Sequence, residues 1–475
     1  MEEFNKPNLR NAIIEALAAN FEHIPTPDQQ NFIEKMAEFL LPESKWDTFI
    51  LRGYAGTGKT TCISALVKVL PTLKLKYQLL APTGRAAKVV SNYTQRTAYT
   101  IHRHIYSVSD NKGGLHMVLR PNRAKNTLYI VDEASMISGE EDQGVRMNLL
   151  QDLIAFVDGG ENCALLFIGD IAQLPPVHTT LSPALIPREL RDWHDRSVTG
   201  AQLTKVVRQG LDSGILSNAT GIREQIDAQT TALQLDEKFE DVLRIDGMEL
   251  QEVLEDAFTS DHADETILIT KSNKRAAQFN DGIRKRILYR EEQLEAGDRL
   301  MIVKNNYFWM PAMQEGGFIA NGDVAEVLRI SNREERYGFD FADVQLRFEE
   351  YQSEPVLEVK VLMNTLLSEK AGLSSSESEQ LYESVASDYS HLKSRAQKYL
   401  AMKKDPYFQA LHVKFAWAIT AHKAQGGQWE NVIVDQGFLS EETLDSSYLR
   451  WLYTAVTRAK KKLFFLNFNE VFFKE

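Results

Sequence analysis

The stretch Gly53-Tyr-Ala-Gly-Thr-Gly58-Lys59-Thr60 carries the strongest information about the fold. It has the spacing G-x-x-x-x-G-K-[ST], and it stands between the apolar run Phe49–Leu51 and the helical pattern Cys62–Leu70. In such a loop, backbone N–H groups close around phosphates, and the helix N-terminus adds partial positive charge. We expect Lys59 to contact the β- and γ-phosphates and Thr60 to ligate Mg²⁺. The sequence therefore predicts ATP and Mg²⁺ as cofactors, with the nucleotide held by Gly53, Ala55, Gly56, Thr57, Gly58, Lys59, Thr60 and Thr61.

Further short apolar runs surround this motif, each followed by a glycine, proline or aspartate turn. Runs that are apolar on both faces are typical of parallel strands buried between helices. They fall into two groups, before about residue 200 and after about residue 265, which favours an α/β fold with two parallel sheets. The predicted strands are Phe49–Leu51, Tyr77–Leu80, Leu128–Val131, Leu165–Ile168, Ile267–Ile269, Val432–Val434 and Leu463–Leu466.

Residues 324–362 follow a different pattern, because apolar and polar side chains alternate there. Val344, Leu346 and Phe348 alternate with polar residues, which indicates half-exposed antiparallel strands in a small barrel-like (SH3-like) β module. A serine-rich segment and a helix to about Lys404 follow. We therefore expect a first domain at 1–200 and a second at 201–323 and 411–475, interrupted by a module at 324–410.

A smaller insertion is predicted within the first domain, at about 104–126. Two short alternating runs, Ile105–Ser109 and Leu115–Arg120, flank a glycine-containing loop, a pattern typical of a β-hairpin. The segment is too short to build a core of its own. It is interpreted either as a functional projection or as a surface hairpin.

Two strand ends carry the side chains that ATP hydrolysis requires. Asp132 and Glu133 follow a predicted buried strand, and ligands of α/β sheets bind at the carboxyl ends of strands. Asp132 is expected to help hold Mg²⁺ and Glu133 to activate the attacking water. Gln173, after the next strand, has an amide suited to a γ-phosphate oxygen. Taken alone, each motif also fits a purely structural role: the acidic pair could cap a helix, and Gln173 could lie in an ordinary strand-to-loop transition.

Candidate cations follow later in the chain. Arg208 and Arg458 are predicted to reach the γ-phosphate as arginine fingers, although a lone arginine is more often a surface charge. The segment Thr420–Gln428 concentrates donors suited to phosphates, among them Thr420, His422 and Lys423; His422 alone also fits a structural histidine.

Composition restricts the class of protein. The chain has 475 residues and a net charge of −12, from 54 basic and 66 acidic side chains. Basic residues nevertheless gather at 85–125 and 271–290, in islands that fit either nucleic-acid binding or solvated helix faces. Two cysteines argue against a disulfide framework and against cysteine-rich zinc sites. Neither a signal peptide nor a membrane-spanning run is expected, and the predicted compartment is the cytoplasm.

Taken in order, the motifs resemble those of superfamily 1 helicases, specifically the RecD/Dda-like branch. The resemblance covers residues 26–460. The matching segments are Thr26–Gln29, the phosphate-binding loop, Ala81–Ala87, Thr100–His102, Asp132–Met136, Gly169–Pro176, Val207–Gln209, Phe318–Asp323, His422–Gly426 and Tyr453–Arg458. Two positions depart from the usual pattern: Gln428 stands where a glutamate is usual, and Ala424 where a serine is frequent.

The resemblance implies two RecA-like P-loop domains that bind ATP between them, with Gln29 on the adenine and Gln428 on the ribose. It implies movement 5′→3′ along single-stranded DNA, coupled to duplex unwinding at single-strand/duplex junctions. The side chains it places on the strand are Pro82, Thr83, Arg85, His102, Asn321, Thr420, His422 and Lys423. Alternatives that use the same motifs are a protein-displacing translocase, an RNA motor, and a P-loop switch ATPase that acts on a protein partner.

Overall fold

The computed structural model describes residues 6–111, 114–140, 148–206, 213–230, 233–259, 263–306, 308–310, 319–348, 356–370, 372–437, 439 and 444–474. The chain divides by its contacts into two compact units. The first comprises Met1–Pro82, Ala86–Ser107 and Leu119–Gln229, and the second comprises Thr83–Arg85, Val108–Val118 and Thr230–Glu475. None of the helices among these described residues has the length and apolarity needed to cross a membrane.

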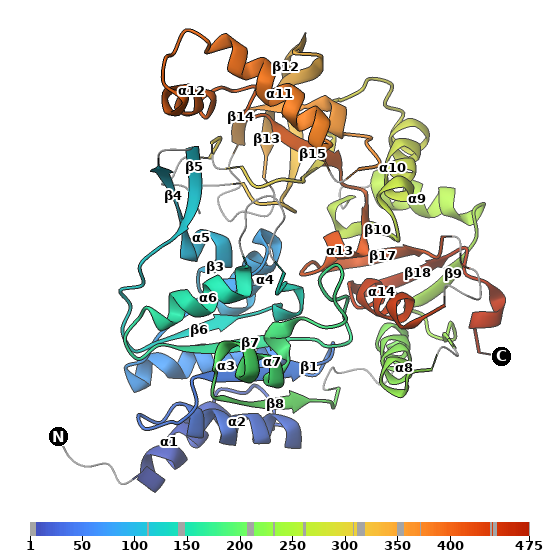
Figure 1. Cartoon of the computed structure of the whole chain (residues 1–475). Coiled ribbons are helices and arrows are strands. Elements are labelled where there is room, and N and C mark those ends of the chain that lie inside the picture. The colour runs from blue at the N-terminus through green and yellow to red at the C-terminus, as the bar shows by residue number, and fades with distance from the viewer. Residues whose placement is uncertain are drawn as a thin grey trace. The chain divides into compact units, whose positions relative to one another are not determined.

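The first unit is built on a six-stranded sheet in the order β3-β2-β6-β7-β1-β8, with every neighbouring pair parallel (Figure 1). Its strands are β1 (Thr48–Gly53), β2 (Lys76–Ala81), β3 (Ala98–Thr100), β6 (Thr127–Val131), β7 (Ala164–Gly169) and β8 (Val198–Leu203). The four strands predicted for this part of the chain are confirmed. The accompanying helices are α1 (Lys6–Ala18), α2 (Pro27–Phe39), α3 (Lys59–Val69), α4 (Gly84–Thr94), α5 (Ile101–Ile105), α6 (Leu149–Asp158), α7 (Pro187–His194) and α8 (Gly214–Ala228).

Burial explains why the central strands were recognisable and the edge strands were not. Phe49 and Leu51 of β1 join one core with residues of α1, α2 and α3, while Ile50, on the opposite face, is also buried. Strand β8 lies at the sheet edge, and its sequence includes Gly200. A Cβ on Gly200 would lie 2.2 Å from the carbonyl oxygen of Ile50, so the close approach of the two backbones leaves no room here for the apolar side chain typical of a buried strand.

The predicted hairpin is confirmed as a separate two-stranded sheet, formed by β4 (Tyr106–Asn111) and β5 (Gly114–Leu119). Its first strand follows α5 directly. Residues 112 and 113 of the predicted loop lie outside the described residues.

The second unit contains a five-stranded parallel sheet in the order β16-β10-β17-β18-β9. The strands are β9 (Val242–Ile245), β10 (Thr266–Thr270), β16 (Ala418–Thr420), β17 (Trp429–Asp435) and β18 (Ala459–Leu466). The three strands predicted here, within β10, β17 and β18, are confirmed. The helices that accompany this sheet are α9 (Glu249–Thr259), α10 (Asn273–Gly282), α13 (Ala421–Ala424) and α14 (Ser446–Val456). The π-helix η5 (Ile283–Ile287) continues α10.

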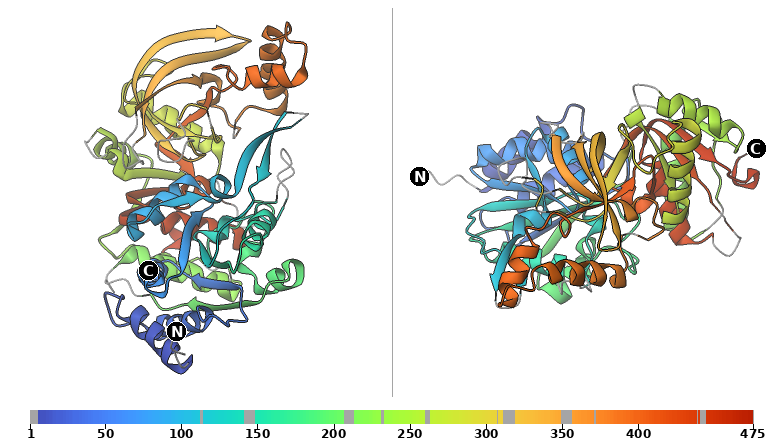
Figure 2. Two further views of the ribbon diagram at one scale, coloured as in Figure 1. Left: turned by 90° about the vertical axis from the view of Figure 1, so that its left-hand side faces the viewer. Right: turned by 90° about the horizontal axis from the view of Figure 1, so that it is seen from above.

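The predicted β module is a closed five-stranded barrel. Its strands are β11 (Arg299–Ile302), β12 (Val324–Arg336), β13 (Phe339–Arg347), β14 (Val356–Leu362) and β15 (Leu411–Phe415), and β12 and β13 curve together in the left view of Figure 2. Strands β11 and β15 lie outside the 324–410 segment expected for the module. Both pair within the barrel, and their side chains share one core with the five-stranded sheet, so the sheet resumes at β16 rather than near Val413. One helix was expected after the serine-rich segment, but the structure has two: α11 (Ser375–Asp388), which begins within that segment, and α12 (Arg395–Met402).

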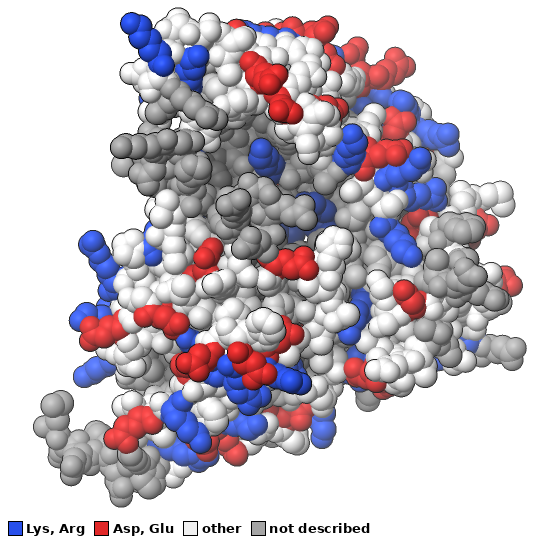
Figure 3. All heavy atoms as spheres, viewed as in Figure 1, with Lys and Arg blue, Asp and Glu red and all other residues white. Residues whose placement is uncertain are grey.

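Most basic side chains in the island at 271–290 are paired with carboxylates and are not a free basic surface. Five of its seven basic side chains form ion pairs with carboxylates: Lys274, Arg275, Arg284, Lys285 and Arg290. Asp298, which is fully buried, accepts from both Arg284 and Arg290. On the face shown in Figure 3, basic and acidic side chains are interspersed. Most of this island therefore serves internal pairing.

Candidate functional site

The loop Gly53–Thr60 lies at the carboxyl end of β1 and leads directly into α3. Gly56 and Gly58 have φ angles of +74° and +88°, a left-handed conformation that favours glycine. A Cβ on Gly58 would lie 2.3 Å from Nε2 of Gln29, and a Cβ on Gly53 would lie 2.8 Å from Oγ1 of Thr57. The glycines thus keep open a backbone cradle that suits phosphate groups.

The Lys59 ammonium is held over this cradle. Its Nζ donates to the carbonyl oxygens of Gly53, at 2.6 Å, and Tyr54, at 2.9 Å. It also lies 4.0 Å from a carboxylate oxygen of Asp170 at the end of β7. These contacts place the lysine at the strand edge where a phosphate chain would be recognised.

Gln29 is bound to the same loop. Its side chain completes a capping box at the start of α2, with Oε1 accepting from the Thr26 N–H at 3.0 Å. Its Nε2 donates to the Thr57 carbonyl at 3.3 Å. The contact with adenine that the resemblance implies remains a prediction, but Gln29 does lie against the nucleotide loop.

Asp132 and Glu133 follow β6 as expected. Asp132 accepts from the Glu133 N–H at 2.8 Å and from the Tyr93 hydroxyl at 2.9 Å. Burial raises the pKa of Asp132, against the opposing effects of these hydrogen bonds and of Lys59. Glu133 has a φ of +52° and a ψ of +36°, an uncommon conformation for a residue with a side chain and one that is enriched at functional sites.

Tyr93 is a functional candidate that the sequence did not reveal. It lies on α4, thirty-nine residues before Asp132, in no recognisable motif. Burial, followed by the charge of Asp132, raises its pKa well above the usual value, so the hydroxyl remains a donor at neutral pH. The hydrogen bond fixes the orientation of the carboxylate expected to help hold Mg²⁺.

Sheet order brings the nucleotide motifs together. Strand β7 pairs with β1 on one side and with β6 on the other, all parallel, so their carboxyl ends lie side by side. Lys59, the Asp132–Glu133 pair and Gln173 follow these three strands. Gln173 is buried, and its N–H donates to the Asp170 carbonyl at 3.4 Å. The structure thus brings the predicted ATP residues of the first unit to one edge.

The donor set at this edge fits Mg²⁺ bound with a nucleotide. Thr60, exposed in the first turn of α3, offers a hydroxyl, and Asp132 a carboxylate. The part of the chain that the structure describes holds no cluster of three or more carboxylate, histidine or cysteine ligands. Mg²⁺ typically needs only one or two protein ligands when phosphates and water complete its shell.

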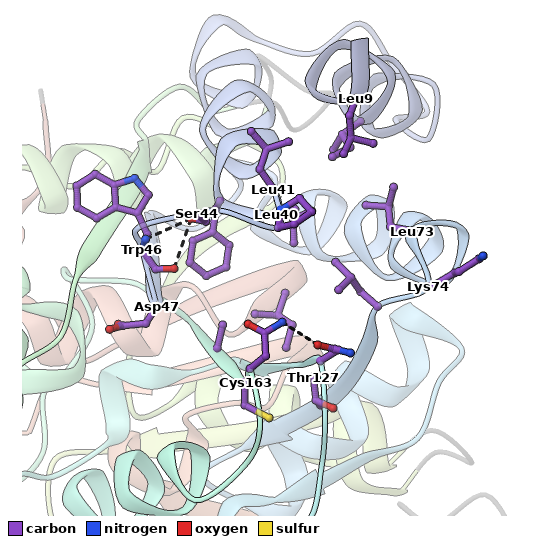
Figure 4. A pocket seen from close by; sticks show the side chains of 18 of the residues that line it. Leu9, Leu40, Leu41, Ser44, Trp46, Asp47, Leu73, Lys74, Thr127 and Cys163 are labelled. Carbon is purple, nitrogen blue, oxygen red and sulfur yellow. Dashed lines mark hydrogen bonds between the residues drawn. The ribbon is translucent and has the colours of Figure 1, made fainter. Parts of the chain in front are cut away.

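A separate pocket of about 720 Å³ lies at the opposite edge of this sheet (Figure 4). It is lined by Asp47, Thr127 and Cys163, near the amino ends of β1, β6 and β7, with an apolar wall that includes Leu9 and Leu73. Nucleotides bind at the carboxyl ends of parallel strands, so this pocket is distinct from the candidate ATP site.

The predicted strand-contacting residues of the first sheet occupy its carboxyl edge as well. Pro82 and Thr83 directly follow β2 and are half-buried, and Arg85, in the first turn of α4, is buried. His102 lies on α5, two residues beyond β3, with its ring 5.8 Å from that of Tyr106.

In the second unit the fold joins two predicted residues that are far apart in sequence. The Lys423 Nζ donates to Oδ1 of Asn321 at 2.6 Å. Burial, together with the neighbouring charge of Lys414, lowers the pKa of Lys423 to about 8. Thr420 is buried at the end of β16, and His422 is exposed on α13. A lysine, an amide, a hydroxyl and an imidazole therefore gather near one strand end.

Of the two predicted arginine fingers, the structure describes Arg458 and not Arg208. Arg458 is buried, and its guanidinium donates to the carbonyls of Thr454 and Gly427 and to the Thr457 hydroxyl, at 3.0 to 3.1 Å. It must exchange some of these bonds to reach a phosphate. Arg208 lies outside the described residues. Gln428 is exposed, and its ribose contact remains a prediction.

Two models of known families match parts of the chain. The model of an AAA domain matches residues 26–243, and that of a UvrD-like helicase C-terminal domain matches residues 415–466. The first match contains the P-loop and the first parallel sheet, and the second contains strands β16, β17 and β18 of the second sheet. Each of these two segments is thus similar to a domain of known nucleotide-driven proteins, and the second is similar to a helicase domain.

Two individual proteins are also similar in sequence. The chain is 32% identical to an ATP-dependent RecD2 DNA helicase of Deinococcus radiodurans over 200 residues, which are 42% of this chain and 25% of that protein. It is 27% identical to an uncharacterized protein of Methanocaldococcus jannaschii over 480 residues, covering 87% of this chain and 36% of that protein. The chain thus spans about a quarter to a third of these relatives' lengths.

Solved structures of Pif1 helicases are also similar. One, of Pif1 from Bacteroides in complex with ADP-AlF3 and ssDNA, has 15% sequence identity and a TM-score of 0.47, covering 96% of this chain and 95% of that one. Another, of Pif1 from Candida albicans, has 14% identity and a TM-score of 0.44, covering 99% and 96%.

The loop geometry yields a prediction about Gly58. Gly58→Ala should abolish binding of a fluorescent ATP analogue, because the added Cβ meets the Gln29 amide and the left-handed backbone disfavours alanine. Gly282→Ala, where the added Cβ meets nothing within 4 Å, is the matched control and should bind as the parent does. Parental affinity in Gly58→Ala would contradict the cradle described above.

Proposed function

We propose that the chain is an ATP-dependent DNA helicase that moves 5′→3′ on single-stranded DNA and unwinds duplex DNA at single-strand/duplex junctions. One observation carries the proposal most directly. Three adjacent parallel strands bring Lys59, the Asp132–Glu133 pair and Gln173 to one edge, in a chain that also carries a UvrD-like helicase C-terminal domain. The name of the RecD2 relative supports DNA as the substrate, and the polarity rests on the family resemblance.

The chemistry assigned to the ATP edge follows from these side chains. Lys59 neutralises the β- and γ-phosphates, while Thr60 and Asp132 hold Mg²⁺, which stabilises the charge on the transferred phosphoryl group. Glu133 orients and deprotonates the attacking water, and Gln173 donates to the γ-phosphate. Arg208 and Arg458 supply further positive charge to the γ-phosphate.

The strand is assigned to the carboxyl edges of both sheets. Pro82, Thr83, Arg85 and His102 follow strands of the first sheet, and Asn321, Thr420, His422 and Lys423 gather near the end of β16. Contacts to phosphates and stacked bases give little sequence preference. The hairpin β4–β5, which follows His102 after three residues, is assigned the role of a wedge that separates the strands.

A test of the ATP chemistry uses two variants and a control. Lys59→Ala should lose hydrolysis, and Glu133→Gln should still bind ATP while losing turnover, because water activation and not phosphate recognition depends on the carboxylate. Glu140→Gln, at an exposed acidic residue, should behave as the parent. The readouts are analogue affinity and phosphate release with and without single-stranded DNA. Hydrolysis that DNA does not stimulate in the parent would favour a switch ATPase instead.

The strand edge gives a prediction about pH. Only protonated Lys423 attracts DNA phosphates, so affinity for a labelled oligothymidine should fall as the pH rises from 7 to 9, through the pKa of about 8. If binding restores an ordinary lysine pKa, the loss attributable to this group is at most about tenfold. Lys423→Arg stays charged over this range and should lose less affinity. Equal losses in the two proteins, measured by fluorescence anisotropy, would exclude Lys423 as the titrating contact.

A further inference from the structure

The side chain of Tyr54 is unexplained by phosphate binding, because the loop recognises phosphates through its backbone at this position. Tyr54 is 6% exposed, and its hydroxyl donates to Asp227 of α8, at 3.0 Å to the nearer carboxylate oxygen. The guanidinium carbon of Arg223, also on α8, lies 4.5 Å from the centre of the Tyr54 ring. The Tyr54 side chain therefore links the loop to α8.

The backbone of Tyr54 faces the nucleotide chemistry. Its carbonyl oxygen accepts from Lys59 Nζ at 2.9 Å and from the Thr57 hydroxyl at 2.8 Å. One residue thus contacts the phosphate-binding lysine through its carbonyl and α8 through its hydroxyl. Burial and the hydrogen bond to Asp227 raise the pKa of Tyr54 to about 12, so the hydroxyl stays a donor throughout the working pH range.

Helix α8 makes further contacts with this part of the first unit. A Cβ on Gly56 would lie 3.2 Å from Leu216 of α8, so the glycine loop and the helix pack closely. Arg223 donates to the Thr204 carbonyl at 3.4 Å, and Asp28 accepts from the Thr204 N–H at 2.7 Å. Helix α8 is also the last element of the first unit, since the long continuous part of the second unit, Thr230–Glu475, follows it in the chain.

We propose that the Tyr54–Asp227 hydrogen bond is a relay that couples the nucleotide state of the P-loop to α8 and, along the chain, to the start of the second unit. Phosphates compete with the Tyr54 carbonyl for the Lys59 ammonium, so nucleotide binding changes the hydrogen bonding of Tyr54. Because the ring is buried against Arg223 and its hydroxyl is bonded to Asp227, a shift of this residue acts on α8. Tyr54 and Asp227 are positioning residues, and their role in driving movement rests on the proposed function.

The primary test is amide hydrogen exchange of α8 in the full chain, with and without a non-hydrolysable ATP analogue. In the parent, the analogue should change the exchange of residues 214–228. In Asp227→Ala and in Tyr54→Phe, the change in exchange caused by the analogue should be at least about fivefold smaller than in the parent. This is in line with the usual size of coupling between sites. The double variant should lose no more than either single one, because both break the same bond. Asp227→Asn keeps an acceptor and should retain most of the response.

The control is Asp152→Ala, which removes the carboxylate that accepts from the Tyr106 hydroxyl elsewhere in the first unit. It should respond to the analogue as the parent does. A parental exchange response in Asp227→Ala, or no response of α8 in the parent, would overturn the relay. A loss of equal size in Asp152→Ala would do the same, because it would reduce the effect to general loosening.

A second readout separates this relay from the proposed function. Asp227→Ala should keep the KM for ATP and the basal rate of hydrolysis. The factor by which single-stranded DNA stimulates hydrolysis should be at least about fivefold smaller than in the parent. If DNA stimulates neither the parent nor the variant, the proposed function fails while the exchange measurement still decides the relay. Parental stimulation in Asp227→Ala would overturn the coupling role even if α8 responds to nucleotide.

Discussion

The parallel pairing of β7 with both β1 and β6 is the constraint on which the candidate ATP site depends. Parallel strands end at the same edge, so the order of the strands brings together three loops that are distant in sequence. The glycines of the P-loop then only need to keep the cradle open, and Lys59 finds carbonyl partners within it. Further hydrogen bonds, from Gln29 to Thr57 and from Tyr93 to Asp132, fix this edge from neighbouring helices.

How far the sequence could predict this arrangement depends on the kind of signal. Buried strands such as β6 are apolar on both faces, and the P-loop has fixed spacing, so both were predicted correctly. Edge strands such as β8, with Gly200 against a neighbouring backbone, lack the apolar pattern. The barrel boundary was placed too narrowly because β11 and β15 are short apolar strands that resemble those of the adjoining sheet.

The site contacts that escaped prediction are tertiary ones. The hydrogen bond between Lys423 and Asn321 joins residues 102 positions apart, and that between Tyr54 and Asp227 joins residues 173 positions apart. No local pattern reports such a distance. The number of basic residues at 271–290 also did not predict a free basic surface, because most of them pair with carboxylates such as the buried Asp298. Residue types in a motif specify chemistry, whereas the fold decides which side chains share it.

The central claim, that ATP hydrolysis drives the chain along single-stranded DNA to open a duplex, is tested most directly by single-turnover unwinding. The substrate is a short labelled duplex with a single-stranded tail, offered as a 5′-tailed and a 3′-tailed form with ATP and Mg²⁺. The account predicts unwinding of the 5′-tailed duplex and little or none of the 3′-tailed one. Failure to unwind either form under conditions in which the strand stimulates hydrolysis would contradict the helicase assignment, and preference for the 3′ tail would contradict the polarity.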